Sequence, residues 1–481
     1  MPHDPQFSAL SQRPEADDDV PFRYVDLFAG IGGFAAVLSG MGGAPVYSVE
    51  IDKAAAEIYK LNWGHAPSGA KSNGDSWGDI TLDANDEVMN VPPHEILAAG
   101  FPCQPFSKSG AQRGMDETRG TLFWNILKIV QAHHPKILLL ENVRNLAGPR
   151  HKHEWDVIIE SLRAEGYAIS ETPTIFSPHL LPLSLGGRPQ IRERVFITAT
   201  YDPDGLKDGE VIFPPVRNES LREGEEWNLV ADLPLDLDTP AGTELTPTEI
   251  EWITAWDEWV KYMWSATRQR AGSNPEAAKL PGFPVWVDAW VHESKLVVPA
   301  GTPAWKENFL RKNSALYTQN QEYFDAWVEA HQVSKFPPSR RKLEWQAQQT
   351  PTLWECVMQM RPSGIRAKRA THLPALVAIT QTSIYGPSRR RLAPHEVARL
   401  QGLPDEFTFG NQKSSLTLKQ LGNGVNIGAV WHVLKAHVER DETILQQDET
   451  GRKILKAVQN APNSPDDVLP ELLRRTRTRM D

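Results

Sequence analysis

The sequence predicts an α/β protein in which a mostly parallel sheet carries helices on both faces, joined to a smaller, irregular second domain. From residue 22 to about residue 200, short apolar runs alternate with amphipathic stretches, an alternation typical of βαβ units. After residue 200 this alternation stops, and proline and acidic residues accumulate. The 481 residues also exceed what one hydrophobic core usually serves, so we expect more than one domain.

The large domain is predicted from five short apolar runs, each of strand length. We expect strands at 24–28, 46–50, 96–99, 137–140 and 195–199. Between the last two, Trp155, Ile158, Ile159 and Leu162 recur at helical spacing. This spacing indicates a helix that packs on the sheet.

The smaller domain is predicted from its tryptophans. Trp252, Trp256, Trp259 and Met263 follow one face of a helix, so we interpret them as core residues rather than as a binding surface. Eleven of the sixteen tryptophans lie between residues 227 and 354, which indicates a separate packed core. We expect a disordered tail at 1–21, the large domain at 22–200 and the smaller domain at 201–414. A return segment at 415–440 should complete the large domain, and a charged C-terminal extension should follow at 441–481.

The net charge of −10 is unevenly distributed along the chain. Residues 201–260 hold 16 acidic and three basic side chains, whereas residues 331–400 hold 12 basic and three acidic ones. The basic stretch allows a phosphate-binding surface despite the acidic total. Such clusters are as often solvated faces, so charge alone leaves both interpretations open.

The composition favours a cytoplasmic protein without a membrane partner. No apolar run in the sequence reaches the roughly 20 residues that a membrane span needs, and the polar, acidic N-terminus lacks the layout of a secretory signal. Cys103 and Cys356 are the two cysteines, and they stand far apart in the sequence. A disulfide framework is therefore not expected.

A glycine-rich segment follows the first expected strand. Gly30, Gly32 and Gly33 would let the backbone approach a bound nucleotide where a helix begins. Glu50 ends the second strand, at a position where a carboxylate can hold ribose hydroxyls. Because Gly30, Gly32 and Ala35 also satisfy the relaxed dinucleotide pattern, an NAD-dependent oxidoreductase is an open alternative at this point.

Two other strand ends carry reactive side chains. Cys103 follows Pro102 just beyond the strand at 96–99, and Glu141 follows directly on the strand at 137–140. In open α/β sheets, functional residues lie beyond the carboxyl ends of the strands, so the thiol and the carboxylate should face one crevice. Cys103 is the best candidate for a nucleophile, although a lone cysteine is more often an inert, small apolar residue.

The order and spacing of seven sequence blocks resemble those of the DNA (cytosine-5) methyltransferases. The blocks are 26–34, 78–80, 100–107, 141–143, 190–194, 391–404 and 420–425. The likeness covers about residues 22–200 and 359–440. It implies a Rossmann-like catalytic domain and a target-recognition domain at 201–414. The oxidoreductase alternative leaves the blocks around Cys103 and Glu141 unexplained.

For catalysis, the resemblance implies that Cys103 attacks C6 of cytosine as a thiolate, which makes C5 able to accept a methyl group. It assigns Glu141 to the proton or hydrogen bond at N3 of the base. Arg192 and Arg194 would bind the base carbonyl and orient the other two residues. Because the two arginines are two positions apart in a strand that runs into 195–199, we expect both side chains on one face.

The resemblance also implies S-adenosylmethionine as the methyl donor, and no metal. Phe28 would stack on the adenine, Glu50 would bind the ribose and Asp79 the adenine amino group. The full set of expected donor-binding residues is Phe28, Gly30, Gly32, Gly33, Glu50, Asp79, Ile80, Pro102, Asn423, Gly424 and Val425. Two positions depart from the family pattern: Gly424 stands where serine or alanine is commoner, and Ile51 where an aromatic residue is frequent.

A base inside a duplex hides its C6 atom, so the resemblance implies that the target nucleotide is flipped out of the helix. Residues 107–121 have the glycine and basic content of a flexible loop that closes over the phosphate backbone. A solvated surface loop is the alternative for this segment. The expected DNA contacts are Gln104, Ser107, Arg113, Arg119, Arg366 and Lys368.

We therefore expect an enzyme that methylates C5 of cytosine within a specific sequence of double-stranded DNA. It should act as a monomer in the cytoplasm and be paired with a restriction endonuclease. An RNA cytosine-5 methyltransferase with the same blocks is one alternative, disfavoured by the large segment at 201–370. A catalytically silent DNA-binding homologue is the other.

Overall fold

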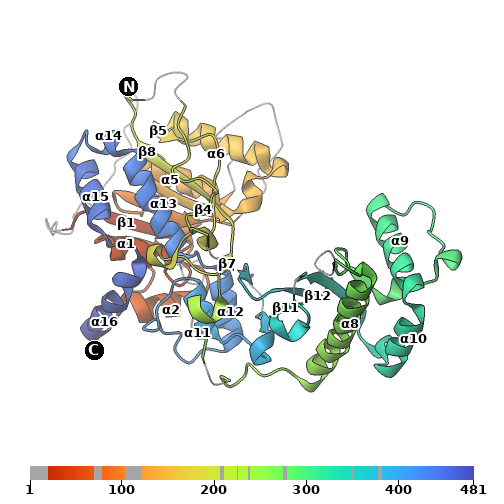
Figure 1. Ribbon diagram of the computed structural model, residues 1–481. Helices are drawn as coiled ribbons and strands as arrows, with labels where there is room; N and C mark the ends of the chain where they lie inside the picture. The colour runs from red at the N-terminus through yellow and green to blue at the C-terminus, as the bar shows by residue number, and fades with distance from the viewer. Residues whose placement is uncertain are drawn as a thin grey trace.

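The computed structural model describes residues 20–69, 78–102, 121–205, 211–224, 226–233, 235–236, 239–274, 279–348, 350–376 and 382–480. These residues form two lobes, a large one around a central sheet and a smaller one that carries α8, α9 and α10 and projects to one side (Figure 1). Nearly all of the expected tail at 1–21 lies outside the described residues.

The large lobe is built on a seven-stranded sheet with the order β2-β1-β3-β4-β8-β5, in which β6 also pairs with β8. Strands β2, β1, β3 and β4 are mutually parallel, whereas β8 is antiparallel to β4, β5 and β6. One reversed strand leaves the sheet mostly parallel, and all five expected strands are present. Their bounds are β1 (Arg23–Leu27), β2 (Ala44–Val49), β3 (Ile96–Gly100), β4 (Ile137–Val143), β5 (Tyr167–Ile169), β6 (Thr174–Phe176) and β8 (Arg194–Tyr201).

Helices cover both faces of this sheet, because successive side chains of a strand point to opposite faces. Ile96 and Ala98 of β3 pack in the core cluster with one group of helices, whereas Leu97 and Ala99 pack in a second cluster with another group. The first group includes α1 (Gly33–Gly40), α2 (Lys53–Trp63) and α13 (Ile427–Arg440), and the second α5 (Leu122–His133) and α6 (Lys152–Ala164). Helix α6 is the one predicted from the spacing around Trp155.

The C-terminal part of the chain returns to the large lobe and completes its core. Helices α11 to α16 contribute buried side chains to the same cluster as α1, and they lie beside the N-terminal elements in Figure 1. The two ends of the chain therefore share one core. The remaining bounds here are α3 (Ile80–Asp83), α11 (Pro394–Leu400), α12 (Ser414–Asn423), α14 (Glu442–Leu445), α15 (Glu449–Asn460) and α16 (Leu469–Met480).

The smaller lobe has its own core cluster, which extends from Leu245 to Ile384. Trp256 and Trp259 on α8 are fully buried, with ring centroids 5.6 Å apart, so the tryptophan stripe is core as predicted. Its helices are α8 (Pro247–Ala271), α9 (Ala304–Gln319) and α10 (Gln321–Ala330), preceded by α7 (Leu229–Asp232). They accompany a six-stranded sheet, β15-β14-β11-β12-β10-β9, made of β9 (Val285–Trp286), β10 (Lys342–Gln346), β11 (Cys356–Arg361), β12 (Gly364–Arg369), β14 (Ile384–Tyr385) and β15 (Arg390–Arg391).

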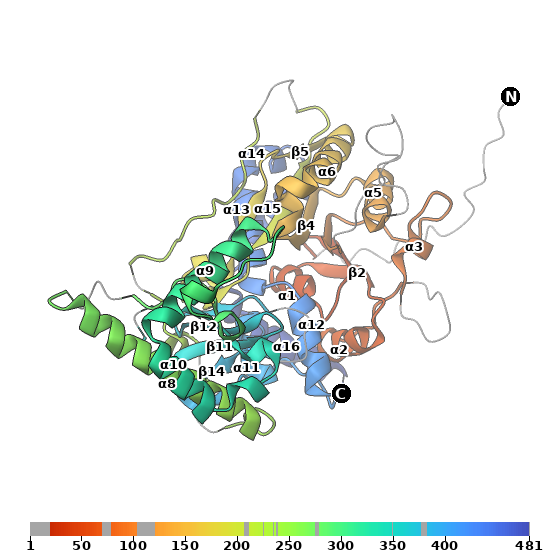
Figure 2. The ribbon, with the colours of Figure 1, turned by 90° about the vertical axis from the view of Figure 1, so that its right-hand side faces the viewer.

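A short parallel pair of strands joins the two lobes. Strand β7 (Gln190–Ile191), just before β8, pairs with β13 (Leu373–Pro374), just after β12. Viewed at 90° to Figure 1, the smaller lobe lies in front of the large one (Figure 2). The contact between β7 and β13 therefore fixes the base of the smaller lobe beside the carboxyl end of β4, because β4 and β8 are neighbours in the large sheet.

Candidate active site

The carboxyl ends of β3 and β4 lie side by side, since Gly100 pairs with Glu141 in the parallel register. The side-chain amide of Asn142 donates a hydrogen bond to the carbonyl oxygen of Phe101 at 2.8 Å, which ties the two strand ends together. Pro102 is exposed and is the last described residue before 103–120. The expected site residues in that segment, which lie outside the described residues, are Cys103, Gln104, Ser107, Arg113 and Arg119.

Glu141 is buried at the end of β4 and forms an ion pair with Arg194. The Nε atom of Arg194 lies 3.0 Å from Oε1 of Glu141. Burial raises the pKa of the Glu141 carboxyl, and the positive charges of Arg194 and Arg192 oppose this rise. A buried carboxyl whose pKa is raised can act as a proton donor at a higher pH than an ordinary glutamic acid.

Arg192 lies in the bend between β7 and β8, not within the strand that the sequence analysis expected. That strand begins at Arg194. The Arg192 guanidinium donates from Nη1 to the carbonyl of Leu376 at 2.7 Å, and from Nη2 to the carbonyls of Gly422 at 2.9 Å and Gly424 at 2.6 Å. Burial lowers the pKa of Arg192 to about 9, so it is cationic at neutral pH. Arg192 thus joins the bend, the segment after β13 and the end of α12.

A second part of the site lies at the carboxyl ends of β1 and β2. The carboxylate of Glu50 accepts hydrogen bonds from the backbone N–H groups of Gly30 at 2.8 Å and Asp52 at 2.7 Å. Gly30 has φ of 56°, and a Cβ atom there would have no neighbour within 4 Å. Ile51 is 60% exposed beside Glu50, and Phe28 holds a positive φ of 57°. These features are suited to binding a nucleoside, because they combine open space over a glycine, a fixed carboxylate and an exposed apolar side chain.

The start of α1 meets the segment that follows α12. Gly32 caps α1 with φ of 92°, and a Cβ atom on Gly33 would lie 2.5 Å from Cγ2 of Val425. Asn423, the last residue of α12, is exposed, and Gly424 follows it. This close approach brings the N-terminal and C-terminal blocks that are expected to bind the donor to one place.

Asp79 and Ile80 stand where α3 begins. The Oδ1 atom of Asp79 accepts hydrogen bonds from the backbone N–H of Thr81 at 3.0 Å and from its hydroxyl at 2.7 Å, and Ile80 is buried. Asp79 is therefore an N-cap.

Comparison with known proteins decides the family. A family model for C-5 cytosine-specific DNA methylases matches residues 22–439. The chain belongs to this family. It is 45% identical to the type II methyltransferase M.AluI of Cellulosimicrobium cellulans, over 91% of this chain and 96% of that protein. It is 39% identical to the type II methyltransferase M.HhaI of Haemophilus parahaemolyticus, over 36% of this chain and 48% of that protein.

The resemblance inferred from the seven sequence blocks is thereby confirmed, and the chain is a DNA (cytosine-5) methyltransferase. Among solved structures, S. pombe Dnmt2 methyltransferase matches with a TM-score of 0.44 and 16% identity, over 88% of this chain and 99% of that chain. None of the helices in the described ranges combines the length and apolar character of a membrane span. The same ranges contain no cluster of side chains suited to a metal ion.

Two buried residues of this methyltransferase were missed by the sequence analysis. The backbone N–H of Arg192 donates to the hydroxyl of Ser177 at 2.9 Å. Asp26 on β1 is fully buried next to the glycine-rich segment, and burial raises the pKa of its carboxyl well above the ordinary value. Asp26 stands within the first sequence block, but Ser177 has no local signal because its partner is remote in the sequence.

The two expected DNA contacts of the smaller lobe lie on β12. Arg366 donates from Nε to Glu344 at 2.6 Å. Lys368 stands two positions further along the strand and so points to the same face. Its ammonium makes no hydrogen bond or ion pair with any residue, as far as the described ranges extend. Lys368 is thus the cation of this pair that is available to an external anion.

Proposed function

We propose that this methyltransferase transfers a methyl group from S-adenosylmethionine to C5 of a cytosine in a specific sequence of double-stranded DNA. The observation that carries the proposal is the ion pair between the buried Glu141 at the end of β4 and the half-buried Arg194. The register of β3 and β4 brings this pair beside Gly100, three residues before Cys103. A proton donor and a fixed cation beside a candidate thiolate are what addition to a pyrimidine ring requires.

In the proposed reaction, the thiolate of Cys103 forms a bond to C6 of cytosine. Glu141 donates a proton or hydrogen bond to N3, so that the electron pair displaced from the C5–C6 double bond becomes available at C5. Arg194 and Arg192 balance the charge near the base carbonyl and hold Glu141 in place. C5 takes up the methyl group. Water then accepts the C5 proton, the electron pair of the C5–H bond re-forms the C5–C6 double bond, Cys103 leaves C6 as a thiolate, and any proton given to N3 returns to Glu141.

We assign the donor to the crevice between the β1 and β2 strand ends and the end of α12. S-adenosylmethionine supplies the electrophilic methyl group when it is bound. Glu50 would hold the ribose hydroxyls, because its carboxylate is fixed by two backbone N–H groups. Phe28 and the exposed Ile51 would contact the faces of the adenine, and Asp79 and Ile80 would contact its edge. The rest of the crevice would be lined by Gly30, Gly32, Gly33, Pro102, Asn423, Gly424 and Val425.

The duplex must release the target nucleotide before Cys103 can reach C6. We assign Gln104 to the space that the flipped base leaves, and Ser107, Arg113 and Arg119 to the phosphate backbone. The segment 201–414 would read the sequence, with Arg366 and Lys368 as contacts to DNA. The separate, tryptophan-rich core at 245–384 supports this role for the smaller lobe. The packing of α11 in the large core favours a return of the chain to the catalytic domain before residue 415.

Similarity to M.AluI over nearly the full length of both chains supports a type II modification enzyme that is paired with a restriction endonuclease. We further propose that it acts as a monomer in the cytoplasm. A gene for an endonuclease with the same recognition sequence, next to this gene, is the expected genomic arrangement. Absence of such a gene would count against the pairing but not against the reaction.

The reaction is tested by expressing the gene in a host without DNA methylation and sequencing the methylated bases. We expect 5-methylcytosine at one defined duplex sequence. Purified enzyme should methylate duplex DNA and not total RNA, and activity on RNA alone would overturn the proposal. Cys103→Ala should abolish transfer and the covalent adduct with 5-fluorocytosine DNA, while binding of the donor stays unchanged. An adduct in that variant would remove Cys103 from its proposed role.

A further inference from the structure

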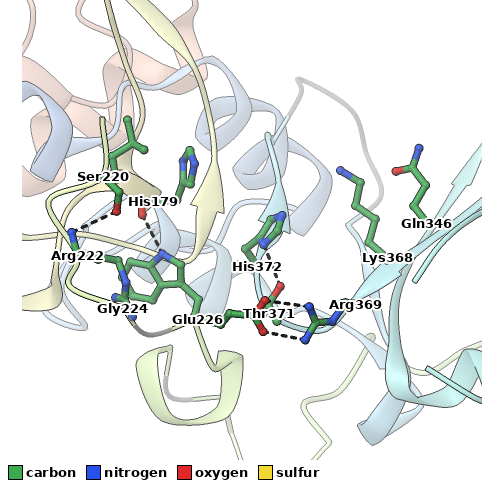
Figure 3. A pocket seen from close by; sticks show the side chains of 12 residues that line it. His179, Ser220, Arg222, Gly224, Glu226, Gln346, Lys368, Arg369, Thr371 and His372 are labelled. Carbon is green, nitrogen blue, oxygen red and sulfur yellow. Dashed lines mark hydrogen bonds and ion pairs between the residues drawn. The ribbon is translucent and has the colours of Figure 1, made fainter. Parts of the chain in front are cut away.

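The two lobes meet at a junction that is hollow rather than close-packed. A cavity of about 560 Å³ lies there (Figure 3), lined by the 3₁₀ turn Pro178–Leu180, the connection at 220–227, and β10 and β12 with the residues that follow. An ion pair crosses it, in which both Nη atoms of Arg369 donate to Glu226 at 2.8 and 2.7 Å. These side chains are 40% and 65% exposed, and exposed ion pairs contribute little to stability. The pair therefore holds the smaller lobe only weakly.

Arg192 makes a buried contact near the same junction. It follows directly on β7, whose partner strand β13 belongs to the segment that leaves β12. The Nη1 atom of Arg192 donates to the carbonyl oxygen of Leu376, two residues beyond β13, at 2.7 Å. Backbone pairing and a side chain thus both tie this point of the large lobe to the chain that leads back to β12. The proposed DNA contacts Arg366 and Lys368 lie on that strand.

The other end of the same guanidinium is bonded to the wall of the donor crevice. Nη2 of Arg192 donates to the carbonyl oxygens of Gly422 at 2.9 Å and Gly424 at 2.6 Å. Gly424 precedes Val425, which closely approaches Gly33 at the start of α1. Hydrogen bonds from a charged donor are about twice as strong as those between neutral groups. One buried cation therefore holds the end of α12 and the segment after β13 in a fixed relation.

Such a link has a thermodynamic consequence. A methyl donor packed against 424–425 would fix the end of α12, and through Arg192 it would also fix Leu376 and β13. The free-energy cost of ordering these segments would then already be met when DNA binds to the smaller lobe. The effect must hold equally in the reverse order, because coupling between two ligands is reciprocal.

We propose that Arg192 is a positioning residue that couples the binding of the methyl donor to the binding of duplex DNA, so that either ligand raises the affinity for the other. This inference rests on the proposed function, because it takes S-adenosylmethionine and duplex DNA as the two ligands. It goes further by giving Arg192 a role away from the base. The carbonyl groups of Gly424 and Leu376 transmit the occupancy of the crevice to the smaller lobe.

The test is a thermodynamic cycle on the full-length enzyme. Fluorescence anisotropy gives the Kd of a labelled duplex that carries the methylated sequence, without and with saturating S-adenosylhomocysteine, which has no methyl group to transfer. We expect the wild type to bind the duplex about 5–150-fold more tightly when this compound is present, the usual range of coupling between two sites. Calorimetric titration of S-adenosylhomocysteine, with and without the duplex, should give the same coupling factor.

Arg192→Met and Arg192→Lys should both bring this factor toward one. Methionine removes all three hydrogen bonds, whereas lysine keeps the charge but presents a compact ammonium that does not span the two segments. The lysine variant also decides the question if the methionine variant does not fold. In the wild type, S-adenosylhomocysteine should slow hydrogen exchange at Leu373, whose backbone N–H donates to the carbonyl of Pro189 at 2.7 Å. It should not do so in R192K.

Arg188→Met is the matched control. The Arg188 guanidinium also donates to backbone carbonyls, of Arg399 at 2.8 Å and Gly187 at 2.9 Å, and to the carboxylate of Asp466 at 2.6 Å. These partners lie on α11, on the chain before β7 and on the 3₁₀ turn before α16, all in the large lobe. The variant therefore loses comparable bonds without breaking the link between the lobes, and it should keep the wild-type coupling factor.

Four results would overturn the proposal. They are a wild-type coupling factor in R192K, an equal loss of the factor in R188M, unchanged hydrogen exchange at Leu373 in the wild type, and weaker binding of S-adenosylhomocysteine to R192K with an unchanged factor. The last result would make Arg192 a support of the crevice alone. Failure of the proposed function is a separate result. A wild type that methylates duplex DNA with a coupling factor of one refutes only the coupling, whereas a wild type that binds no duplex DNA refutes the function.

Discussion

Arg194, which is half-buried, and the buried Glu141 form an ion pair across two antiparallel neighbours of the large sheet. Glu141 is opposite Phe196, and Arg194 is opposite Val143, so the pair is diagonal and spans two register positions. Both backbones are fixed by the sheet, and the pair exists in the protein alone. The Glu141 carboxyl, our proposed proton donor, is therefore already oriented before a base arrives, which is the arrangement that limits reorganisation during a reaction.

Arg194→Ala should lower both stability and turnover. It leaves the Glu141 carboxylate buried without its nearest cation, a change that costs about 3–5 kcal/mol of folding free energy in comparable buried pairs. The proton donor also loses its orientation, and we expect kcat to fall by about 10²–10³. Denaturant unfolding and methyl-transfer kinetics measure the two effects. Arg194→Lys is the control and should recover part of the stability. An unaltered kcat in the alanine variant would contradict the proposed role of Arg194 in orienting Glu141.

The pH profile should show the raised pKa of Glu141. Its acid form is the proposed proton donor, so kcat should fall as the pH rises through this pKa, which lies above the ordinary value of 4.5. The thiolate of Cys103 requires the opposite change, so the full profile should be bell-shaped. Glu141→Gln should reduce kcat by about 10²–10⁴ and remove the limb due to the carboxyl. Persistence of that limb in the glutamine variant would assign it to another group.

Gly33→Ala should weaken binding of the methyl donor, because its Cβ atom would lie 2.5 Å from Cγ2 of Val425. The helix start and the segment after α12 would have to move apart, at a cost of roughly 1–3 kcal/mol for overpacking. Calorimetric titration with S-adenosylmethionine measures the change. The double variant G33A/V425A removes the clash and should regain most of the lost affinity. If it binds as poorly as G33A alone, the contact between Gly33 and Val425 is not the cause.

Asp26→Asn should change how stability depends on pH. Burial raises the folded-state pKa of Asp26 well above the ordinary value of 3.8, so the native state holds this proton more tightly than the unfolded chain. The stability of the wild type should therefore fall as the pH rises from about the unfolded pKa toward the folded one. Asparagine cannot ionise, so D26N should be at least as stable at neutral pH. Thermal unfolding between pH 4 and 8 measures this difference. If the melting temperature changes equally with pH in both proteins, the expectation is wrong.

The sequence was sufficient for features that depend on neighbouring residues and insufficient for those that depend on remote pairing. Five of the seven strands of the large sheet and the tryptophan stripe of α8 were predicted because apolar periodicity is local, whereas the short strands β5 and β6 were not predicted. Arg192 was expected within a strand, but β7 pairs with β13, which is remote in the sequence, and the chain bends between β7 and β8. The partner of Arg194 could not be read from spacing, since it depends on the register between β4 and β8.

The C-terminal helices illustrate the same limit. The sequence shows a charged extension after residue 440, and its buried leucines on α15 and α16 are few and widely spaced. Their role appears only through packing, of α16 against α1 and α2 and of α15 against α13 and α14. The cavity at the lobe junction combines stretches near 179, 222 and 368, which no local pattern connects.

The close approach of Gly33 and Val425 has a consequence for the synthesis of the enzyme in the cell. While the ribosome is still translating the smaller lobe, the first half of the catalytic domain has emerged but lacks the wall that α12 and α13 supply. A growing polypeptide would therefore acquire the proposed donor pocket only after residue 425 has left the exit tunnel. Prematurely terminated products should consequently be inert toward the chromosome, and two separately produced fragments divided within the smaller lobe should regain activity on mixing.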